Sequence, residues 1–333
     1  MLPISLTSRR CWCIFSRRMS CRYDRALRGF RGEALRGEPL SRHTSYRIGG
    51  PADLYLVPAD EDDLRGFLDR TSRGDFPLFI LGNGSNLLVH DAGLRGAVVD
   101  VRRATRGICR DGEKVWAGAG AELDFLAAWA VEEGLEGLAE LSGIPGTVGG
   151  ALRTNAGAFG RTVSDFLVEV RALTTGGREV RLSRDELGLG YREAKGLKGL
   201  VVVSAAFHLK RGDRKALWEK RRKVLQQRSE RQPLEYPSAG STFKRPPGDH
   251  PGRLIEEAGC KGMRVGDAMV SPKHANFTVN LGKAKASDVW TLIRRVRERV
   301  RERFGVWLEL EVELWGFPEG GLYTGGSPRS PGR

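Results

Sequence analysis

The chain has 333 residues, 40% of them hydrophobic, so it can bury a sizeable core, and its length suggests two or three domains. No run approaches 18 uninterrupted apolar residues, and five cysteines and five histidines show neither paired CxxC nor metal-ligand spacing, so we expect no membrane span, no disulfide framework and no metal site. The formal charge of +14 could suit nucleic acid, but an anionic small molecule or nucleotide cofactor fits it equally.

The distribution of charge weakens the nucleic-acid interpretation. Residues 1–42 hold ten arginines and three acids, which is +7 and half of the total. The first 23 residues contain no acid and lack the apolar core of a secretory signal. An organellar presequence and an extension upstream of a start at Met19 both fit, and we expect residues 1–30 to be a disordered extension. The remaining excess lies on two amphipathic helices, where charges usually form a solvated face.

Residues 31–102 predict a first small α/β unit. YRIGGPADLYLVPADEDDLRGFLDR indicates a glycine turn, a strand over Leu54 to Val57 and an amphipathic helix. FPLFILGNGSNLLVHDAGLRGAVVDV indicates a strand, a glycine loop and a further strand.

Residues 103–225 predict a second unit. It has a strand, a helix ending near Gly134, a long glycine-dense loop and then antiparallel strands in LVEVRALTTGGREVRLS and GLVVVSAAFHLK. A charged helix over about 213–230 leads to a third unit, residues 226–316. This unit contains the helix GRLIEEAG, the strand HANFTVNLG, the strand LELEVELWG, and a helix whose apolar face is Val289, Leu292, Ile293, Val296, Val300 and Phe304. Residues 317–333 predict a flexible tail.

Two glycine-rich segments are candidate ligand sites. In LGNGSNLL, Gly82 and Gly84 follow an apolar strand and could turn backbone N–H groups toward a phosphate, although such loops are often only tight turns. The loop is not a dinucleotide fingerprint, because Leu87 replaces the third glycine and a strand follows. SGIPGTVGGALRTNAGAFG predicts a wall against a large cofactor rather than a floppy loop, because it has the apolar anchors Ile144, Val148, Leu152 and Phe159.

Two polar segments raise questions of chemistry. PSAGSTFKRP places Ser241 three residues before Lys244, as in the acylating motif S-x-x-K, but the partner motifs S-D-N and K-T-G are missing and the prolines disfavour the required helix. We therefore do not expect Ser241 to be a nucleophile. In GLGYRE, Arg192 is a surface residue by default and gains interest if a carboxylate must be held.

The motifs TSYRIGGPADL, LGNGSNLLVHDAGLRG, LSGIPGTVGGALRTNAGAFG, GYRE, PSAGSTFK, GRLIEEAGCKG, SPKHANFTVN and LELEVEL occur in this order between about residues 38 and 315. In this the chain resembles the UDP-N-acetylenolpyruvoylglucosamine reductases, flavoenzymes of peptidoglycan precursor synthesis. The resemblance implies an α/β (α+β) fold: a vanillyl-alcohol-oxidase-type (PCMH-type) FAD-binding module of two α/β subdomains, followed by a C-terminal α/β substrate-binding domain. The short interval after GYR resembles the subgroup that lacks the tyrosine-bearing substrate loop.

The resemblance also implies roles for individual residues. The family's catalytic arginine, serine and glutamate fall on Arg192, Ser241 and Glu311, with the serine as proton donor. The implied FAD-binding residues are Arg47, Ile48, Gly49, Gly50, Gly82, Asn83, Gly84, Ser85, Asn86, Gly143, Ile144, Pro145, Gly146, Thr147, Gly149, Gly150, Asn155 and Gly157. The expected substrate-binding residues are Tyr191, Arg228, Arg231 and Lys244.

Further expectations concern partners and details of the site. The substrate would be a UDP-sugar, reduced in the cytoplasm by a monomer that uses NADPH to reduce non-covalent FAD, and NADH is left open. Arg245 stands where the family often has asparagine, which leaves its substrate contact open. The protonation state of Glu311 is also open, because burial would raise its pKa and a nearby arginine would lower it.

Overall fold

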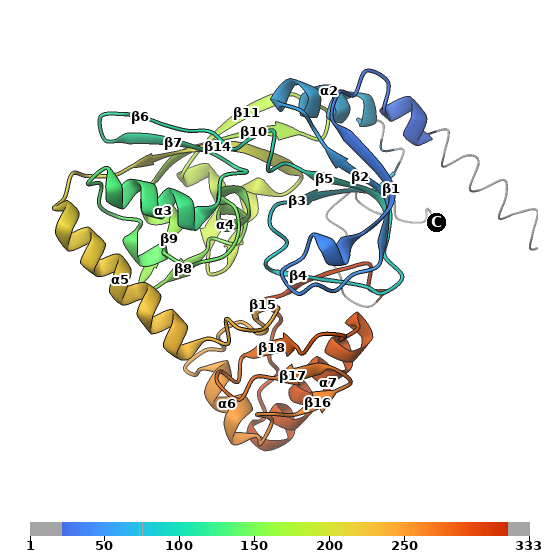
Figure 1. Ribbon diagram of the computed structural model, residues 1–333, viewed down its shortest axis with the longest axis vertical. Helices are drawn as coiled ribbons and strands as arrows, with labels where there is room; N and C mark the ends of the chain where they lie inside the picture. Colours follow the sequence, from blue (N-terminus) through green and yellow to red (C-terminus); the bar gives the residue numbers. More distant parts are fainter. Residues whose placement is uncertain (1–21, 73, 75, 319–333) are drawn as a thin grey trace, which may run out of the picture.

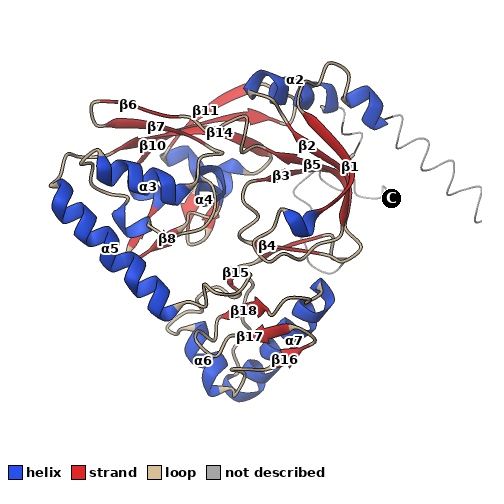
Figure 2. Ribbon diagram, in the orientation of Figure 1, coloured by secondary structure: helices blue, strands red, loops and turns tan. Residues whose placement is uncertain are grey.

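The computed structural model describes residues 22–72, 74 and 76–318. Two sheets lie side by side, and a smaller C-terminal unit lies below them (Figure 1). Helices flank the sheets rather than forming a layer of their own (Figure 2). Each of the three regions has its own cluster of buried apolar side chains.

The first unit is a four-stranded sheet in the order β1-β2-β5-β3. Its strands are β1 (Glu33–Pro39), β2 (Pro51–Val57), β3 (Leu78–Leu81) and β5 (Leu94–Asp100). Only β1 pairs antiparallel, whereas β2 and β3 are both parallel to β5. Helix α2 (Glu61–Thr71) begins where Asp60 accepts a hydrogen bond from the Asp63 backbone N–H, and its buried residues face the sheet.

The ends of the packed chain differ from the prediction. Residues 22–26 are helical, and Tyr23 and Ala26 are buried with Leu54 and Phe67, so the predicted disordered extension 1–30 is wrong for this stretch. Phe317 is also buried and packs against Trp290, so it does not belong to a flexible tail. Residues 1–21 with the proposed start at Met19, and residues 319–333, lie outside the described part.

The second unit is an antiparallel five-stranded sheet in the order β11-β10-β14-β7-β6. Its strands are β6 (Ile108–Asp111), β7 (Lys114–Gly118), β10 (Leu167–Thr174), β11 (Glu179–Ser183) and β14 (Leu200–His208). Helices α3 (Leu123–Glu132), α4 (Val148–Arg153) and α5 (Arg214–Arg231) accompany it, with the two-residue strands β8 (Gly157–Ala158), β9 (Arg161–Thr162), β12 (Leu189–Gly190) and β13 (Glu193–Ala194). The 3-10 turns of this unit are η2 (Ala139–Leu141), η3 (Val163–Asp165), η4 (Asp185–Leu187) and η5 (Lys195–Leu197). A further 3-10 turn, η1 (Leu40–Arg42), lies between β1 and β2 of the first unit.

Four features of this unit were not predicted. The glycine-dense stretch contains α4, which starts because Thr147 caps the Gly150 backbone N–H. Its expected anchor Phe159 is instead exposed. Helix α5 runs without a break across the predicted boundary at residues 225 and 226. Its arginines are also not all solvated, because Arg221 is buried in an ion pair with Asp124.

The third unit has the antiparallel sheet order β15-β18-β17-β16. Its elements are β15 (Ser238–Ser241), α6 (Pro251–Glu257), β16 (Arg264–Val265), β17 (Ala268–Val270), β18 (Phe277–Asn280) and α7 (Ala286–Phe304). The predicted apolar face of α7 is confirmed, because all six of its residues pack in the cluster of this unit. Ser241 is the last residue of strand β15, so the segment PSAGSTFKRP does not form the helix that the S-x-x-K motif requires.

The last strand, which was predicted within the third unit, pairs with a strand of the first unit instead. β19 (Glu313–Trp315) pairs in parallel with β4 (Leu87–Val89) of the first unit. Trp315 is buried there beside Phe79, which explains why the strand returns to the first unit. The chain after α7 therefore connects the C-terminal unit to strand β4 of the first unit.

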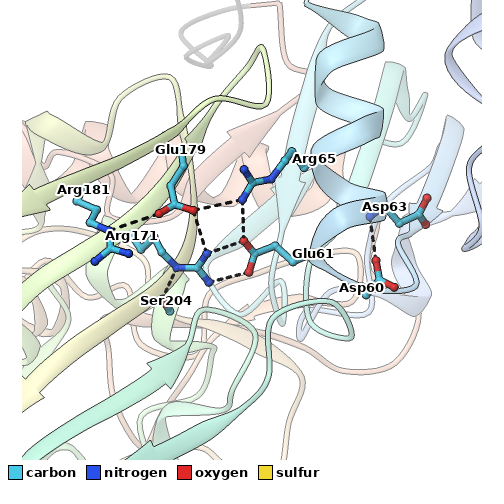
Figure 3. Close-up of polar contacts among 8 residues, drawn as sticks. All are labelled: Asp60, Glu61, Asp63, Arg65, Arg171, Glu179, Arg181 and Ser204. Atoms are coloured by element: carbon cyan, nitrogen blue, oxygen red, sulfur yellow. Dashed lines mark hydrogen bonds and ion pairs between the residues drawn. The ribbon is translucent and has the colours of Figure 1, made fainter.

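A polar cluster joins the first two units (Figure 3). The Arg171 guanidinium of β10 donates two hydrogen bonds of 2.6 Å to the Glu61 carboxylate of α2. Arg65 of α2 and Glu179 of β11 complete the cluster with a contact of 3.2 Å. Bidentate arginine–carboxylate pairs fix orientation as well as distance, so this cluster holds α2 against the second sheet.

Candidate functional site

A cavity of about 560 Å³ lies among the three units. It is lined by the loop after β3, the segment leading into α4, the start of β14, the end of α5, and β15. Ligand cavities in proteins typically measure about 300–1,000 Å³, so this one can hold a large ligand.

The two predicted glycine segments meet at this cavity. Twelve of the predicted cofactor-binding residues line it: Gly82, Asn83, Gly84, Ser85, Asn86, Ile144, Pro145, Gly146, Thr147, Gly149, Gly150 and Gly157. The segments also touch each other, because the Ser85 hydroxyl donates to the Pro145 carbonyl at 3.2 Å. A methyl group on Gly82 would lie 2.5 Å from Thr147 Oγ1, so the close approach requires glycine.

The other six predicted cofactor residues do not line the cavity. Ile48 is buried in the core of the third unit, and Arg47 lies beside it in the left-handed region at φ 56°. Gly49 and Gly50 pack on neighbouring backbone, where a methyl group on Gly50 would lie 2.1 Å from the Asp91 carbonyl oxygen. None of these four residues therefore contacts the cavity directly.

Gly143 and Asn155 support the cavity wall from behind. The Gly143 N–H donates to Asp124 at 2.7 Å. Asn155 Nδ2 donates to the Gly190 carbonyl at 3.0 Å, while its Oδ1 is buried without a partner in the described residues. The second contact ties the wall to the segment that carries Arg192.

A second cavity, of about 430 Å³, opens beyond the first. Four of the described residues line both cavities: Arg192, Ser241, His274 and Glu311. The three predicted catalytic residues are thus brought together at this junction from distant parts of the sequence. Only residues 193–199 separate Arg192 from β14, so the segment after GYR is short, as expected.

Local structure fixes each of these side chains. Arg192 adopts φ 56°, a left-handed conformation that is unfavourable for a residue with a side chain. Ser241 is the last residue of β15 and pairs with Phe277 of β18. The backbone of Glu311 is held from two sides, because its N–H donates to the Thr242 carbonyl at 3.0 Å and its carbonyl accepts from Asn86 Nδ2 at 3.0 Å.

Arg192 and Glu311 form an ion pair, with Nε 2.5 Å from Oε1. Within the described residues, Arg192 Nε makes no well-aligned hydrogen bond despite its burial. Burial raises the pKa of Glu311, and the opposing effects of Arg192 and Lys244 do not outweigh it. Glu311 therefore holds its proton to a higher pH than an ordinary glutamate does.

The predicted substrate residues are divided between several places. Tyr191 lines the second cavity, and its hydroxyl accepts from the Arg245 N–H at 3.2 Å. Arg228 and Arg231 line the first cavity instead. Lys244 lines neither cavity and pairs with Glu309 at 3.7 Å.

Sequence reasoning missed several functional candidates. The second cavity has more cations than acids on its lining, because Arg253, Lys261 and Lys273 join Arg192 and Arg245 there, against Glu256 and Glu311. Arg253 forms ion pairs with Asp249 and Glu257, and Lys261 forms one with Glu256. Lys261 and His274 lie within quoted motifs, GRLIEEAGCKG and SPKHANFTVN, so a signal for them existed. Among the described residues, no three or more His, Cys, Asp or Glu side chains are grouped to hold a metal. In the same part of the chain no helix is long and apolar enough to cross a membrane.

Known proteins resemble the chain along most of its length. Residues 232–315 match the family described as UDP-N-acetylenolpyruvoylglucosamine reductase, C-terminal domain, and residues 52–183 match the FAD binding domain. UDP-N-acetylenolpyruvoylglucosamine reductase 2 of Symbiobacterium thermophilum is 48% identical over 86% of this chain and 93% of its own. The reductase of Heliobacterium modesticaldum is 44% identical over 91% of this chain and 97% of its own.

A solved structure agrees with these relatives. The crystal structure of UDP-N-acetylenolpyruvylglucosamine reductase from Thermus caldophilus covers 86% of this chain and 99% of its own, with a TM-score of 0.73 and 38% identity. The predicted fold class, a vanillyl-alcohol-oxidase-type FAD-binding module of two α/β subdomains followed by a C-terminal α/β domain, is thereby confirmed.

Proposed function

Because the chain belongs to the UDP-N-acetylenolpyruvoylglucosamine reductase family, we propose that it reduces the enolpyruvyl group of UDP-N-acetylglucosamine enolpyruvate to give UDP-N-acetylmuramate, with NADPH as the reductant and FAD as the cofactor. The observation that carries this proposal is the junction, where Arg192, Ser241 and Glu311 separate a glycine-lined cavity from a basic one.

The first cavity fits FAD. Gly82 and Gly149 approach Thr147 and Ala119 too closely for a methyl group, so their backbone forms a smooth wall suited to a pyrophosphate. Arg228 is 8% exposed and its Nε is buried without a partner in the described residues, which suits an acceptor on a bound ligand. When bound, FAD supplies the hydride that is added to the terminal alkene carbon of the substrate.

Arg192 and Glu311 would manage the negative charge that this addition creates. Hydride addition beside a carboxylate spreads an electron pair into an enediolate-like group, which needs preorganised positive charge and donors. The Arg192 guanidinium can hold the substrate carboxylate. Burial raises the pKa of Glu311 above that of an ordinary glutamate, and in its protonated form this side chain would donate a hydrogen bond to the developing enediolate.

Ser241 would then give its hydroxyl proton to the carbon next to the carboxylate. It lies at the end of a strand on the junction, so its position is fixed by β15 and its pairing with Phe277. Such proton transfer by a positioned group typically accelerates a reaction by about 10²–10⁴-fold.

The second cavity would receive the UDP part of the substrate. Its cations Arg245 and Lys273 suit a diphosphate, and Arg253 and Lys261 would join them by exchanging their present partners Asp249, Glu257 and Glu256. Lys244 pairs with Glu309 outside the cavity. We also propose that the enzyme acts in the cytoplasm. We propose further that it is a monomer, because one chain contributes all four residues that line both cavities. Light scattering of the purified protein tests the monomer.

The proposal is tested by separating the two half-reactions under anaerobic conditions. For the Ser241→Ala variant we expect NADPH to reduce the flavin at the wild-type rate, and the enolpyruvyl substrate to reoxidise it about 10²–10⁴-fold more slowly. Ser229→Ala is the matched control, because Ser229 is exposed on α5 and its hydroxyl bonds within its own helix. Equal damage to both half-reactions would contradict the proton-donor role, and a wild-type protein that the substrate cannot reoxidise would contradict the function.

A further inference from the structure

His274 is the fourth residue at the junction, and nothing in the proposed chemistry yet uses it. Among the described residues, only Arg192, Ser241, His274 and Glu311 line both cavities. His274 precedes β18, and the Phe277 N–H donates to the His274 carbonyl at 2.9 Å, which forms the turn into that strand. Because Phe277 pairs with Ser241, the turn places His274 close to the end of β15.

The contacts of the His274 ring define its hydrogen-bonding state. Nδ1 accepts a hydrogen bond from the Asn276 N–H at 3.2 Å, so the neutral ring carries its hydrogen on Nε2. The ring also packs edge-on against Phe277, with centroids 4.9 Å apart. Burial, supported by the nearby Lys261, lowers the pKa of His274, which favours the neutral ring. Within the described residues no protein atom accepts a hydrogen bond from Nε2.

We propose that His274 is a further substrate-binding residue, whose Nε2–H donates a hydrogen bond to the substrate carboxylate at the junction of the two cavities. This inference rests on the proposed function. The carboxylate is attached to the carbon that receives the proton from Ser241, so it must lie at the junction, where His274 also lies. The diphosphate would instead meet the cations that line only the second cavity, such as Arg245 and Lys273.

A neutral donor suits this position. Arg192 already supplies a positive charge beside Glu311. Because Nδ1 accepts from the Asn276 N–H, the ring does not readily take up a second proton. A neutral imidazole N–H is a poor acid, so His274 would bind the carboxylate without competing with Ser241 as the proton donor.

Two ligands that differ in the carboxylate test the inference: UDP-N-acetylmuramate carries it and UDP-N-acetylglucosamine does not. Calorimetric titration of the FAD-loaded protein gives the affinity for each. In the His274→Asn variant, the side-chain oxygen can still accept from the N–H two residues ahead, so the turn is kept while the Nε2 donor is lost. In His274→Gln, the longer amide restores a donor near the Nε2 position.

We expect His274→Asn to weaken the binding of UDP-N-acetylmuramate by about 10–100-fold, the range for losing a hydrogen bond to a charged group. The affinity for UDP-N-acetylglucosamine should not change. His274→Gln should recover most of the loss. Equal weakening of both ligands, or a Gln variant as impaired as the Asn variant, would overturn the carboxylate contact. If the wild-type protein binds neither ligand, the proposed function itself fails, and this outcome is distinct from the other two.

Discussion

The contact between Gly82 and Thr147 gives a quantitative test of how the first cavity is built. In Gly82→Ala the new methyl group would lie 2.5 Å from Thr147 Oγ1. Thr147 is 2% exposed and caps α4 through the Gly150 N–H, so it can move only by leaving the cap. Overpacking typically costs about 1–3 kcal/mol and a lost cap about 1 kcal/mol, so we expect the free energy of unfolding to fall by about 2–4 kcal/mol.

A double-mutant cycle separates this clash from other effects. Thr147→Ala alone should cost about 1 kcal/mol as a lost cap, and Gly82→Ala combined with Thr147→Ala should be more stable than Gly82→Ala alone. Gly107→Ala is the control, because a methyl group there meets nothing within 4 Å. Urea unfolding of the apo-protein, followed by circular dichroism, measures all four. If the two substitutions add, or if Gly82→Ala is as stable as Gly107→Ala, the reasoning is refuted.

Three further predictions concern ion pairs and strain. Glu61→Gln should lower the free energy of unfolding by about 1 kcal/mol, since its bidentate pair with Arg171 is about a quarter exposed, whereas Asp62→Asn should change it by less than about 0.5 kcal/mol. Equal effects in urea unfolding would refute the bridge between units. Arg192→Gly should be more stable than Arg192→Ala by about 0.5–1 kcal/mol, because only glycine relieves the left-handed backbone, and equal stability would show no strain. The pKa of Glu311 is raised by burial, so its contribution to stability is present below pH 4.5 and is lost as the pH rises through its folded pKa. In urea unfolding at a series of pH values, the free energy of unfolding of wild type minus that of Glu311→Gln should therefore fall as the pH rises. A difference that increases with pH would contradict the burial argument.

The parts of the fold that follow local patterns could be predicted from the sequence. The 3.6-residue periodicity of α7 identifies its buried face, and the glycines around Gly82 and Gly146 identify the cavity wall. Helix α4 could not be predicted in the same way, because its glycines suppress helix propensity and its start depends on the Thr147 cap. The pairing of β19 with β4 joins segments more than 200 residues apart, and no local pattern encodes such a register.

The site shows the same division. Arg192, Ser241 and Glu311 could be named from the resemblance, and the structure brings them to one junction. Lys244 could not be placed, because only the antiparallel bridge of Phe243 with Leu310 determines that it faces Glu309. His274 was overlooked although it lies in the motif SPKHANFTVN, because the motif alone does not show which of its side chains reaches a cavity. Its position at both cavities follows from the turn into β18.

The central claim is that the glycine-lined cavity holds a flavin. Titration of FAD into the folded apo-protein, followed by the visible absorbance of the flavin and by calorimetry, tests it most directly. The account predicts saturable binding of one FAD per chain, weakened in Gly82→Ala and unchanged in Gly107→Ala. A folded apo-protein that shows no affinity for FAD would contradict the claim.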